Sequence, residues 1–257
     1  MTDPVLEVSG IDFSYGPLQV LFDVSIDVED GERVGLLGTN GAGKSTILGV
    51  VSGLLRPSGG RVTLFGEDIT GLEPHQRVDR GLMQIAGGKA TFPTLTVADN
   101  IRLGMYRKMR QRHLVESRVS EALDVFPQLA TRMSQAAGTL SGGEQQMVAL
   151  SRALVSGAKV LLIDEVSLGL APVVMAEVLR MVEELAARGV TMILVEQSLN
   201  VSLALAQRAY FMERGTIRFQ GPTSDLVGRS DLVRAVFFGA DKPSVATKPP
   251  RKVARAR

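Results

Sequence analysis

Runs of hydrophobic residues predict the strands of this chain. Val24, Ile26 and Val28 alternate with polar residues, as in a strand that is buried on one face. The segment VGLLG predicts a short strand that ends at Gly38. KVLLID and VTMILVE are short and continuously apolar, which is typical of buried strands in a parallel sheet. The segment RVTLFGEDI predicts one more strand, and RAYFMERGTIRFQG predicts two strands that join at Arg214–Gly215.

A different spacing predicts helices between these strands. After Lys44 the apolar positions are Ile47, Val51, Leu54 and Leu55, and we expect this helix to end at RPSGG. Residues from about 94 to 156 are predicted to be mostly helical, and another helix should begin at Pro172 and end at Gly189. Together these elements predict an α/β fold with a parallel core sheet, a helical insert and some antiparallel strands.

The charge of the chain is uneven. Its 29 Lys and Arg and 27 Asp and Glu give a net charge of +2, but the last sixteen residues hold six basic residues and no acidic one, so the rest carries −4. We expect residues 241–257 to be a disordered basic tail that follows a domain of residues 1–240. A solvated end is the simplest interpretation, and contact with nucleic acid or anionic lipid is the alternative. The tail has no aromatic residue, so base stacking is not expected there.

Composition excludes several classes of site. The chain has no cysteine, which excludes disulfides, thiolate metal sites and a cysteine nucleophile. Its start, MTDPVLEVSG, has neither the basic nor the apolar region of a signal peptide, and no apolar run is long enough to span a bilayer. We therefore expect that any role at a membrane depends on another chain.

The segment GTNGAGKST predicts a phosphate-binding loop. Gly38, Gly43, Lys44 and Ser45 fit the pattern G-x-x-x-x-G-K-[ST], after a predicted strand and before a predicted helix. In such a loop the backbone amides and the helix dipole hold phosphate oxygens, Lys44 reaches the β and γ phosphates, and the Ser45 hydroxyl binds Mg²⁺. The loop residues are Gly38, Thr39, Asn40, Gly41, Ala42, Gly43, Lys44, Ser45 and Thr46. A glycine-rich turn without a ligand is the alternative.

Two acidic residues follow the apolar run VLLI. We expect Asp164 to hold Mg²⁺ through water and Glu165 to polarise the water that attacks the γ phosphate. An acid pair that caps a helix or lies on the surface is the alternative.

The segment SGGE predicts a second phosphate cradle. Ser141 and Glu144 fit the capping box S-x-x-E, but a cap does not explain Gly142 and Gly143. Glycines at a helix start let a ligand approach bare backbone amides. The alternative is a loose helix start, and the spacing does not say whether the cradle serves the same chain's nucleotide or a neighbour's.

GTNGAGKST, LSGGEQQ and VLLIDE, in this order, resemble the nucleotide-binding domain of ABC transporters over residues 5–238. The resemblance implies a P-loop NTPase fold with a parallel core sheet, an antiparallel β subdomain and a helical subdomain at about 94–156. It also implies a dimer in which each ATP lies between Gly38–Thr46 of one subunit and Ser141–Gln145 of the other. Those residues are Ser141, Gly142, Gly143, Glu144 and Gln145, and Tyr15 matches the aromatic residue that stacks on adenine.

EVSLGLAPVV and LVEQSLN are similar to the ATP-binding subunits of branched-chain amino acid importers. The similarity places Gln197 at the position where most ABC proteins have a histidine. A glutamine can hydrogen-bond the γ phosphate or the attacking water, but it cannot shuttle a proton. The expected catalytic residues are therefore Glu165, Gln197 and Lys44.

The chain departs from the family pattern at two positions. Gly87 stands where the family has a glutamine or glutamate that senses the metal, and Val166 stands where a proline usually follows the catalytic glutamate. Gln84 would substitute for the missing side chain only if the loop were remodelled. We expect slow basal hydrolysis from these differences.

The resemblance implies an ATPase subunit that powers import of a small polar solute, with branched-chain or related amino acids favoured. The expected cofactors are ATP and Mg²⁺. The expected partners are membrane permease subunits, a second ABC ATPase subunit in a homo- or heterodimer and, indirectly, an extracytoplasmic solute-binding protein, with no nucleic acid. The protein would lie peripherally on the cytoplasmic face of the inner (plasma) membrane. The alternatives are a regulatory nucleotide-binding module with little hydrolysis, suggested by Gly87 and Val166, and a soluble ABC ATPase of repair or translation.

Overall fold

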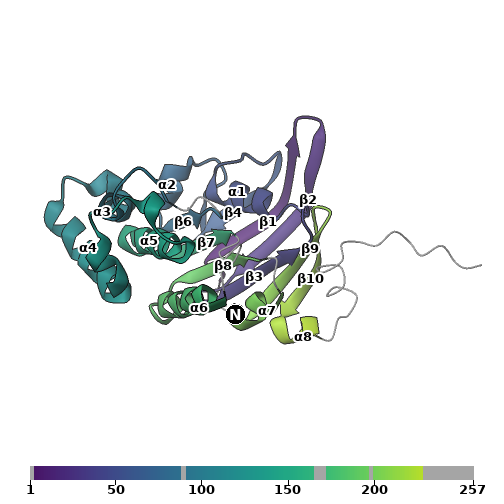
Figure 1. The fold of residues 1–257 in the computed structure, drawn as a ribbon. Coiled ribbons are helices and arrows are strands. Elements are labelled where there is room, and N and C mark those ends of the chain that lie inside the picture. The colour runs from purple at the N-terminus through teal and green to yellow at the C-terminus, as the bar shows by residue number, and fades with distance from the viewer. Residues whose placement is uncertain (1–2, 88–90, 165–171, 197–198, 228–257) are drawn as a thin grey trace, which may run out of the picture.

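The computed structural model describes residues 3–87, 91–164, 172–196 and 199–227 (Figure 1). A six-stranded sheet has the order β10-β9-β3-β8-β7-β6, and all of its neighbouring strands are parallel except the pair β9 and β10. The strands are β3 (Arg33–Gly38), β6 (Leu82–Ile85), β7 (Val160–Asp164), β8 (Thr191–Val195), β9 (Arg208–Glu213) and β10 (Thr216–Pro222). The predicted parallel core sheet is confirmed, and so is the pair of strands joined at Arg214–Gly215.

A second sheet is antiparallel and has the order β2-β1-β4-β5. Its strands are β1 (Leu6–Tyr15), β2 (Leu18–Val28), β4 (Gly59–Leu64) and β5 (Glu67–Asp68). The apolar residues of β1, β2 and β4 form one core with helix α1 (Lys44–Ser52) and with one face of β3, β7 and β8. Helix α1 is thereby fixed between the two sheets, which fixes the loop before it as well.

Helices cover the other face of the large sheet. They are α3 (Val97–Arg102), α4 (Arg112–Val125), α5 (Gly142–Ser156) and α6 (Pro172–Ala187), with a 3₁₀ helix at Leu103–Lys108 between α3 and α4. Their buried apolar residues form a second core with Ile85, Leu161 and Met192 of the sheet. Two shorter helices, α7 (Leu199–Leu205) and α8 (Thr223–Val227), follow β8 and β10. The prediction of a mostly helical segment after residue 94 is confirmed, with further 3₁₀ turns at Pro127–Arg132 and Ala137–Thr139.

Two predicted elements end earlier than their apolar patterns suggest. The segment RVTLFGEDI forms two strands, β4 and β5, because Phe65 and Gly66 both have positive φ angles (49° and 78°) and turn the chain. Helix α1 stops at Ser52 because Gly53 adopts φ 83° and donates its amide to Val50 O. Leu54, predicted to lie in that helix, is consequently exposed.

Among the described elements, five were not predicted from the sequence. They are β1, β6, the short helix α2 (Pro74–Asp79), which precedes β6 at the edge of the large sheet, and the helices α7 and α8. Within the described ranges, every helix is too short or too polar to cross a lipid bilayer.

Candidate nucleotide-binding site

The loop GTNGAGKST lies between the end of β3 and the start of α1. Gly43 is the N-cap of α1, with φ 103°, and no side chain caps the helix there. The Gly43 carbonyl accepts from Ile47 N (2.9 Å), which is the first hydrogen bond of the helix. The amides of Lys44, Ser45 and Thr46 lie in the turn before it and have no carbonyl partner within the helix. A helix start with no side-chain cap is suited to an anion.

Close packing fixes the course of this loop. Gly38 has φ 151°, and a Cβ atom there would meet the backbone oxygen of Met212 on β9. A Cβ atom at Gly43 would lie 2.8 Å from Leu21 Cδ2 on β2. Strand β9 at Gly38 and strand β2 at Gly43 therefore occupy the space that a side chain would need at either end of the loop.

The Lys44 side chain is folded back over the loop. Its amino group donates to Gly38 O (2.8 Å) and Thr39 O (2.9 Å), and the residue is 5% exposed. A cavity of about 210 Å³ is lined by Val20, Asn40, Gly41, Gly43, Lys44, Ser45 and Thr46. This set of backbone amides, one buried ammonium group and two hydroxyls fits the phosphates of a nucleotide. The structure thus brings six of the nine predicted loop residues together around one cavity.

Asp164 ends β7 and is half-buried. It pairs in register with Val195 of β8, which pairs in turn with Leu36 of β3, two residues before the loop begins. Because parallel strands end at the same edge of a sheet, Asp164 and the loop share that edge. Among the described residues, no group of three or more His, Cys, Asp or Glu could by itself hold a metal ion. A Mg²⁺ ion at this edge would have few protein ligands, as is usual where substrate phosphates and water supply the others.

Ser141 and Glu144 form the predicted capping box at the start of α5. The Glu144 carboxylate accepts from Ser141 N and from Ser141 Oγ, both at 2.8 Å, and it pairs with Arg132 at 2.9 Å. Burial opposes ionisation of Glu144, but the hydrogen bonds from Ser141 and the charge of Arg132 outweigh it and hold the pKa of this carboxyl below its usual value. Gly142 is exposed beside this cap and Gly143 is buried, and Gln145 Nε2 donates to Leu140 O (3.1 Å).

The structure describes some of the remaining predicted residues and not others. Tyr15 ends β1 and is half exposed, with its ring edge-on to Phe13 at a centroid distance of 4.8 Å. Gly87 lies in a turn just after β6. Gln84 lies within β6, and its Oε1 is buried without a hydrogen-bond partner in the described structure. Glu165, Gln197, Val166 and the tail 241–257 lie outside the described residues.

Sequence reasoning missed one residue that supports the site. Arg77 of α2 is 1% exposed and donates to Val50 O and Val51 O, both at 2.8 Å, at the end of α1. It also donates to Thr70 O (2.9 Å) and Leu72 O (3.0 Å). Arg77 thus caps the carboxyl end of the helix whose amino end faces the cavity. An arginine in a short polar segment carries no local signal of such burial.

Comparison with known proteins identifies the family. The family described as ABC transporter matches residues 21–167. The chain is 41% identical to the high-affinity branched-chain amino acid transport ATP-binding protein BraG of Pseudomonas aeruginosa, over 88% of this chain and 95% of that protein. It is 35% identical to the probable branched-chain amino acid transport ATP-binding protein LivF of Archaeoglobus fulgidus, over 87% and 94%.

Solved structures agree with this assignment. The fold matches MJ1267, an ATP-binding cassette of an ABC transporter in its ADP conformation, with a TM-score of 0.83 and 26% identity over 93% of this chain and 100% of that chain. It also matches a nucleotide-free ATP-binding cassette from an ABC transporter, with a TM-score of 0.82 and 26% identity over 92% and 99%. The phosphate-binding loop, the capped SGGE helix and these relatives together show that the chain belongs to the ABC transporter family, as one of its ATP-hydrolysing ATP-binding cassettes.

Proposed function

We propose that this protein powers the import of branched-chain or related amino acids through a partner permease. The observation that carries the proposal is the 41% identity with BraG, which extends over 88% of the chain. The second relative, LivF, has a name of the same kind. The protein would work on the cytoplasmic face of the inner membrane, and an extracytoplasmic binding protein would deliver the solute.

The proposed catalytic unit is a dimer. Each ATP would be held by Gly38–Thr46 of one subunit and by Ser141–Gln145 of the other. The exposed start of α5 supports this arrangement, because Ser141 and Gly142 are exposed and an incoming phosphate can approach the backbone amides of the first turn there. Closure on ATP and reopening after hydrolysis would drive the permease between its two states.

Different residues of the chain would bind the phosphates, orient the attacking water and hold Mg²⁺. Lys44 would exchange its two carbonyl partners for phosphate oxygens, and Glu165 would orient the attacking water. Ser45 and Asp164 would hold Mg²⁺, which neutralises charge on the phosphates when bound. Gln197 would hydrogen-bond the γ phosphate or the water without transferring a proton.

Transport in a reconstituted system tests this function. The protein, with the permease that copurifies with it and the cognate binding protein, is placed in proteoliposomes and ATP-dependent uptake of labelled leucine is measured. Uptake should require ATP and should be lost in Lys44→Ala, the matched control. ATP hydrolysis without accumulation of leucine, isoleucine or valine would refute the proposed solute class.

A regulatory module with little hydrolysis is the second candidate, because Gly87 offers no side chain to a metal or water just after β6. Steady-state phosphate release from the permease-bound protein separates the two functions. Restoring a glutamine by Gly87→Gln should raise turnover if the missing side chain limits it.

A further inference from the structure

A buried asparagine connects helix α3 to the turn of the chain that leads into it. Asn100 is 0% exposed, and its Nδ2 donates to Phe92 O (3.0 Å), Leu95 O (3.3 Å) and Thr96 O (2.9 Å). Its Oδ1 accepts from Phe92 N (2.8 Å). Every hydrogen bond that the structure describes for this side chain therefore goes to residues 92–96. A buried amide with all its bonds on one turn fixes the shape of that turn.

Helix α3 has a cap of its own and does not need these bonds to begin. Thr96 is its N-cap, and the Thr96 hydroxyl accepts from Asp99 N (3.1 Å) and donates to Asp99 Oδ2 (2.6 Å). The Asn100 backbone amide makes the usual helical bond to Thr96 O (2.9 Å). The Asn100 side chain thus serves the 92–96 turn rather than the helix that carries it.

The other side of the 92–96 turn is paired with the segment that precedes α5. Gly138 N donates to Pro93 O and Ala137 N donates to Leu95 O, both at 2.9 Å. Leu95 O therefore accepts from Asn100 on one side and from Ala137 on the other. The turn is consequently held between α3 and this segment.

The turn and the segment are in close contact. A Cβ atom at Gly138 would lie 2.8 Å from Pro93 Cβ and 2.9 Å from Pro93 O. The φ angle of Gly138 lies outside the left-handed region, so contact with Pro93, and not the backbone angle, limits the residue at this position. The turn cannot move toward the segment without displacing it.

The segment continues directly into the SGGE motif. Ser141, the N-cap of α5, follows Gly138 by three residues. Leu140, between them, is 6% exposed, and it donates its amide to Ala137 O (3.2 Å) and accepts from Gln145 Nε2 at its carbonyl (3.1 Å). This short connection is therefore bonded at both ends, so the start of α5 follows the position of the turn.

The turn also contacts α5 further along the helix and follows the nucleotide edge of the sheet in the chain. Arg152 Cζ of α5 lies 5.5 Å from the centre of the Phe92 ring, and α3 and α5 lie side by side (Figure 1). Before the turn, β6 ends at Ile85, which pairs with the residue that precedes Asp164. The 92–96 turn thus stands in the chain between the sheet edge that carries the nucleotide site and the helix that carries SGGE.

We propose that Asn100 is a positioning residue for ATP hydrolysis, because it fixes the 92–96 turn and through this turn the start of α5. Asn100 does not contact the nucleotide itself. The inference rests on the proposed dimer, in which the SGGE segment of one subunit meets the ATP held by the other. Without the Asn100 side chain, the nucleotide loop keeps its structure, but the start of α5 is no longer fixed where the other subunit's ATP needs it.

Replacing Asn100 with an apolar residue of similar volume tests this role. Asn100→Leu removes the side-chain bonds, and Leu95 O keeps its backbone partner Ala137 N. The Kd of the isolated chain for ATP should change less than twofold, since the nucleotide loop belongs to α1. The kcat for ATP hydrolysis in the complex with the permease should fall at least tenfold. In a Glu165→Gln background, which removes the proposed water-orienting carboxylate, the Kd of the ATP-bound dimer should rise at least tenfold by analytical ultracentrifugation.

Two further variants separate positioning from simple destabilisation. Thr96→Ala is the matched control, because it removes the cap of the same helix and leaves the four Asn100 bonds in place. It should change kcat and the dimer Kd less than twofold. Gly138→Ala acts on the opposite side of the turn and should reproduce the loss. Combined with Asn100→Leu, its effect on kcat should be clearly less than additive, since both variants act on one contact. Gly138→Ala also provides the test if Asn100→Leu does not fold.

The outcomes distinguish this inference from the proposed function. Wild-type kcat and dimer Kd in folded Asn100→Leu or in Gly138→Ala would overturn the inference and leave the dimeric ATPase intact. Equal losses in Thr96→Ala and Asn100→Leu would overturn it as well, because stability of α3 would then explain both. Absence of any ATP-dependent dimer in the Glu165→Gln chain that is otherwise wild type would overturn the proposed dimer together with the inference.

Discussion

Single residues decide whether the nucleotide loop can form at all. Gly38 and Gly16 both have positive φ angles, 151° and 57°, but their surroundings differ. A Cβ atom at Gly38 would strike the Met212 carbonyl, whereas one at Gly16 would meet nothing within 4 Å. We expect Gly38→Ala to lower the free energy of unfolding by at least about 3 kcal/mol, because the strained backbone adds to a clash with β9.

Gly16→Ala provides the comparison for this prediction. It should cost only about 1–2 kcal/mol, the strain of a left-handed alanine. Urea unfolding of both variants measures the difference, and equal losses would show that the contact with β9 is not what requires glycine at Gly38.

Glu144 makes the stability of the protein depend on pH. Because its pKa is lowered in the folded state, its ionised form stabilises the protein above the unfolded pKa of about 4.3, and this contribution is lost as pH falls through the folded pKa. Glu144→Gln should therefore cost about 0.5–1 kcal/mol at pH 7 and progressively less below pH 4.3. Urea midpoints for both proteins between pH 7 and pH 3.5 give the difference, and a gap that stays constant or widens in acid would contradict the hydrogen-bonding account of the cap.

At the scale of elements, helix α1 is fixed from both ends. Arg77 bonds four carbonyl oxygens, two of them in the last turn of α1. Arg77→Met should lower the free energy of unfolding by about 3 kcal/mol or more, because buried carbonyls lose a charged donor. Arg80→Met removes an arginine of the same chain segment that pairs with Glu67 near the surface and donates to one carbonyl oxygen, that of Gln76 (3.1 Å), and it should cost less than about 1 kcal/mol. Similar costs in chemical denaturation would mean that Arg77 is not the cap of α1.

Elements with a regular local pattern were predictable from the sequence, and irregular ones were not. The continuous apolar runs of β7 and β8 predicted buried parallel strands because nothing interrupts them. Strand β1 was missed since Gly10, at φ 61°, lies where its pairing with β2 shifts register. Strand β6 has only four residues and includes Gln84, so neither length nor alternation marks it.

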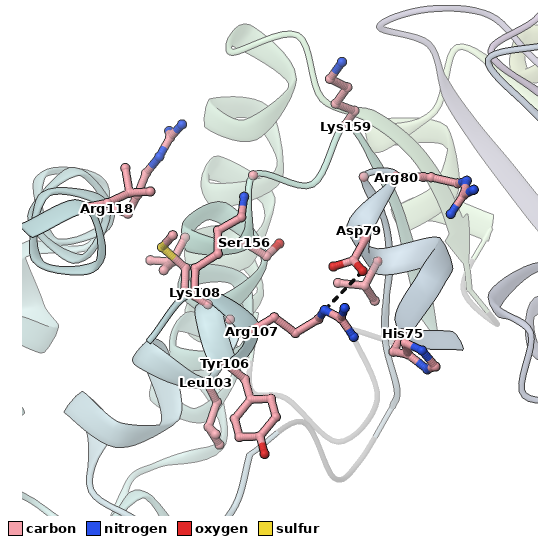
Figure 2. Close-up of a pocket in the computed structure, with 17 residues that line it drawn as sticks. His75, Asp79, Arg80, Leu103, Tyr106, Arg107, Lys108, Arg118, Ser156 and Lys159 are labelled. Atoms are coloured by element: carbon pink, nitrogen blue, oxygen red, sulfur yellow. Dashed lines mark ion pairs between the residues drawn. The ribbon is translucent and has the colours of Figure 1, made fainter. Parts of the chain in front are cut away.

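The same distinction holds for the sites. The nucleotide loop is one continuous segment, so its residue types and spacing are visible in the sequence, and six of its nine residues line one cavity. By contrast, the cleft between α2, the 3₁₀ helix Leu103–Lys108 and the end of α5 is lined by Asp79, Arg107 and Ser156 from three distant segments, so only the tertiary fold brings them together (Figure 2). The role of Arg77 could not be predicted either, because the carbonyl groups of Val50 and Val51 that it contacts lie 27 and 26 residues away in the sequence.

At the scale of the whole molecule, the proposed dimer makes each ATP site a composite of two chains. Lys44→Ala would disable the nucleotide loop. Gly142→Asp would place a carboxylate at the start of α5, which is proposed to face the ATP phosphates held by the other subunit. Each variant alone should show almost no ATP hydrolysis. In an equal mixture, half of the dimers contain one chain of each kind, and each such dimer has one intact site.

The mixture should therefore recover about a quarter of wild-type turnover, a result that only sites shared between two copies can produce. Lys44→Ala mixed with Lys44→Ala,Gly142→Asp is the matched control, because every dimer then lacks both functional loops and should stay inactive. Phosphate release is measured at equal total protein for the wild type, the two single variants and the two mixtures. Turnover in the complementary mixture no higher than in the separate variants would show that the two motifs do not meet across an interface between copies of this chain, and the dimeric mechanism would then fail even though each motif is correctly folded.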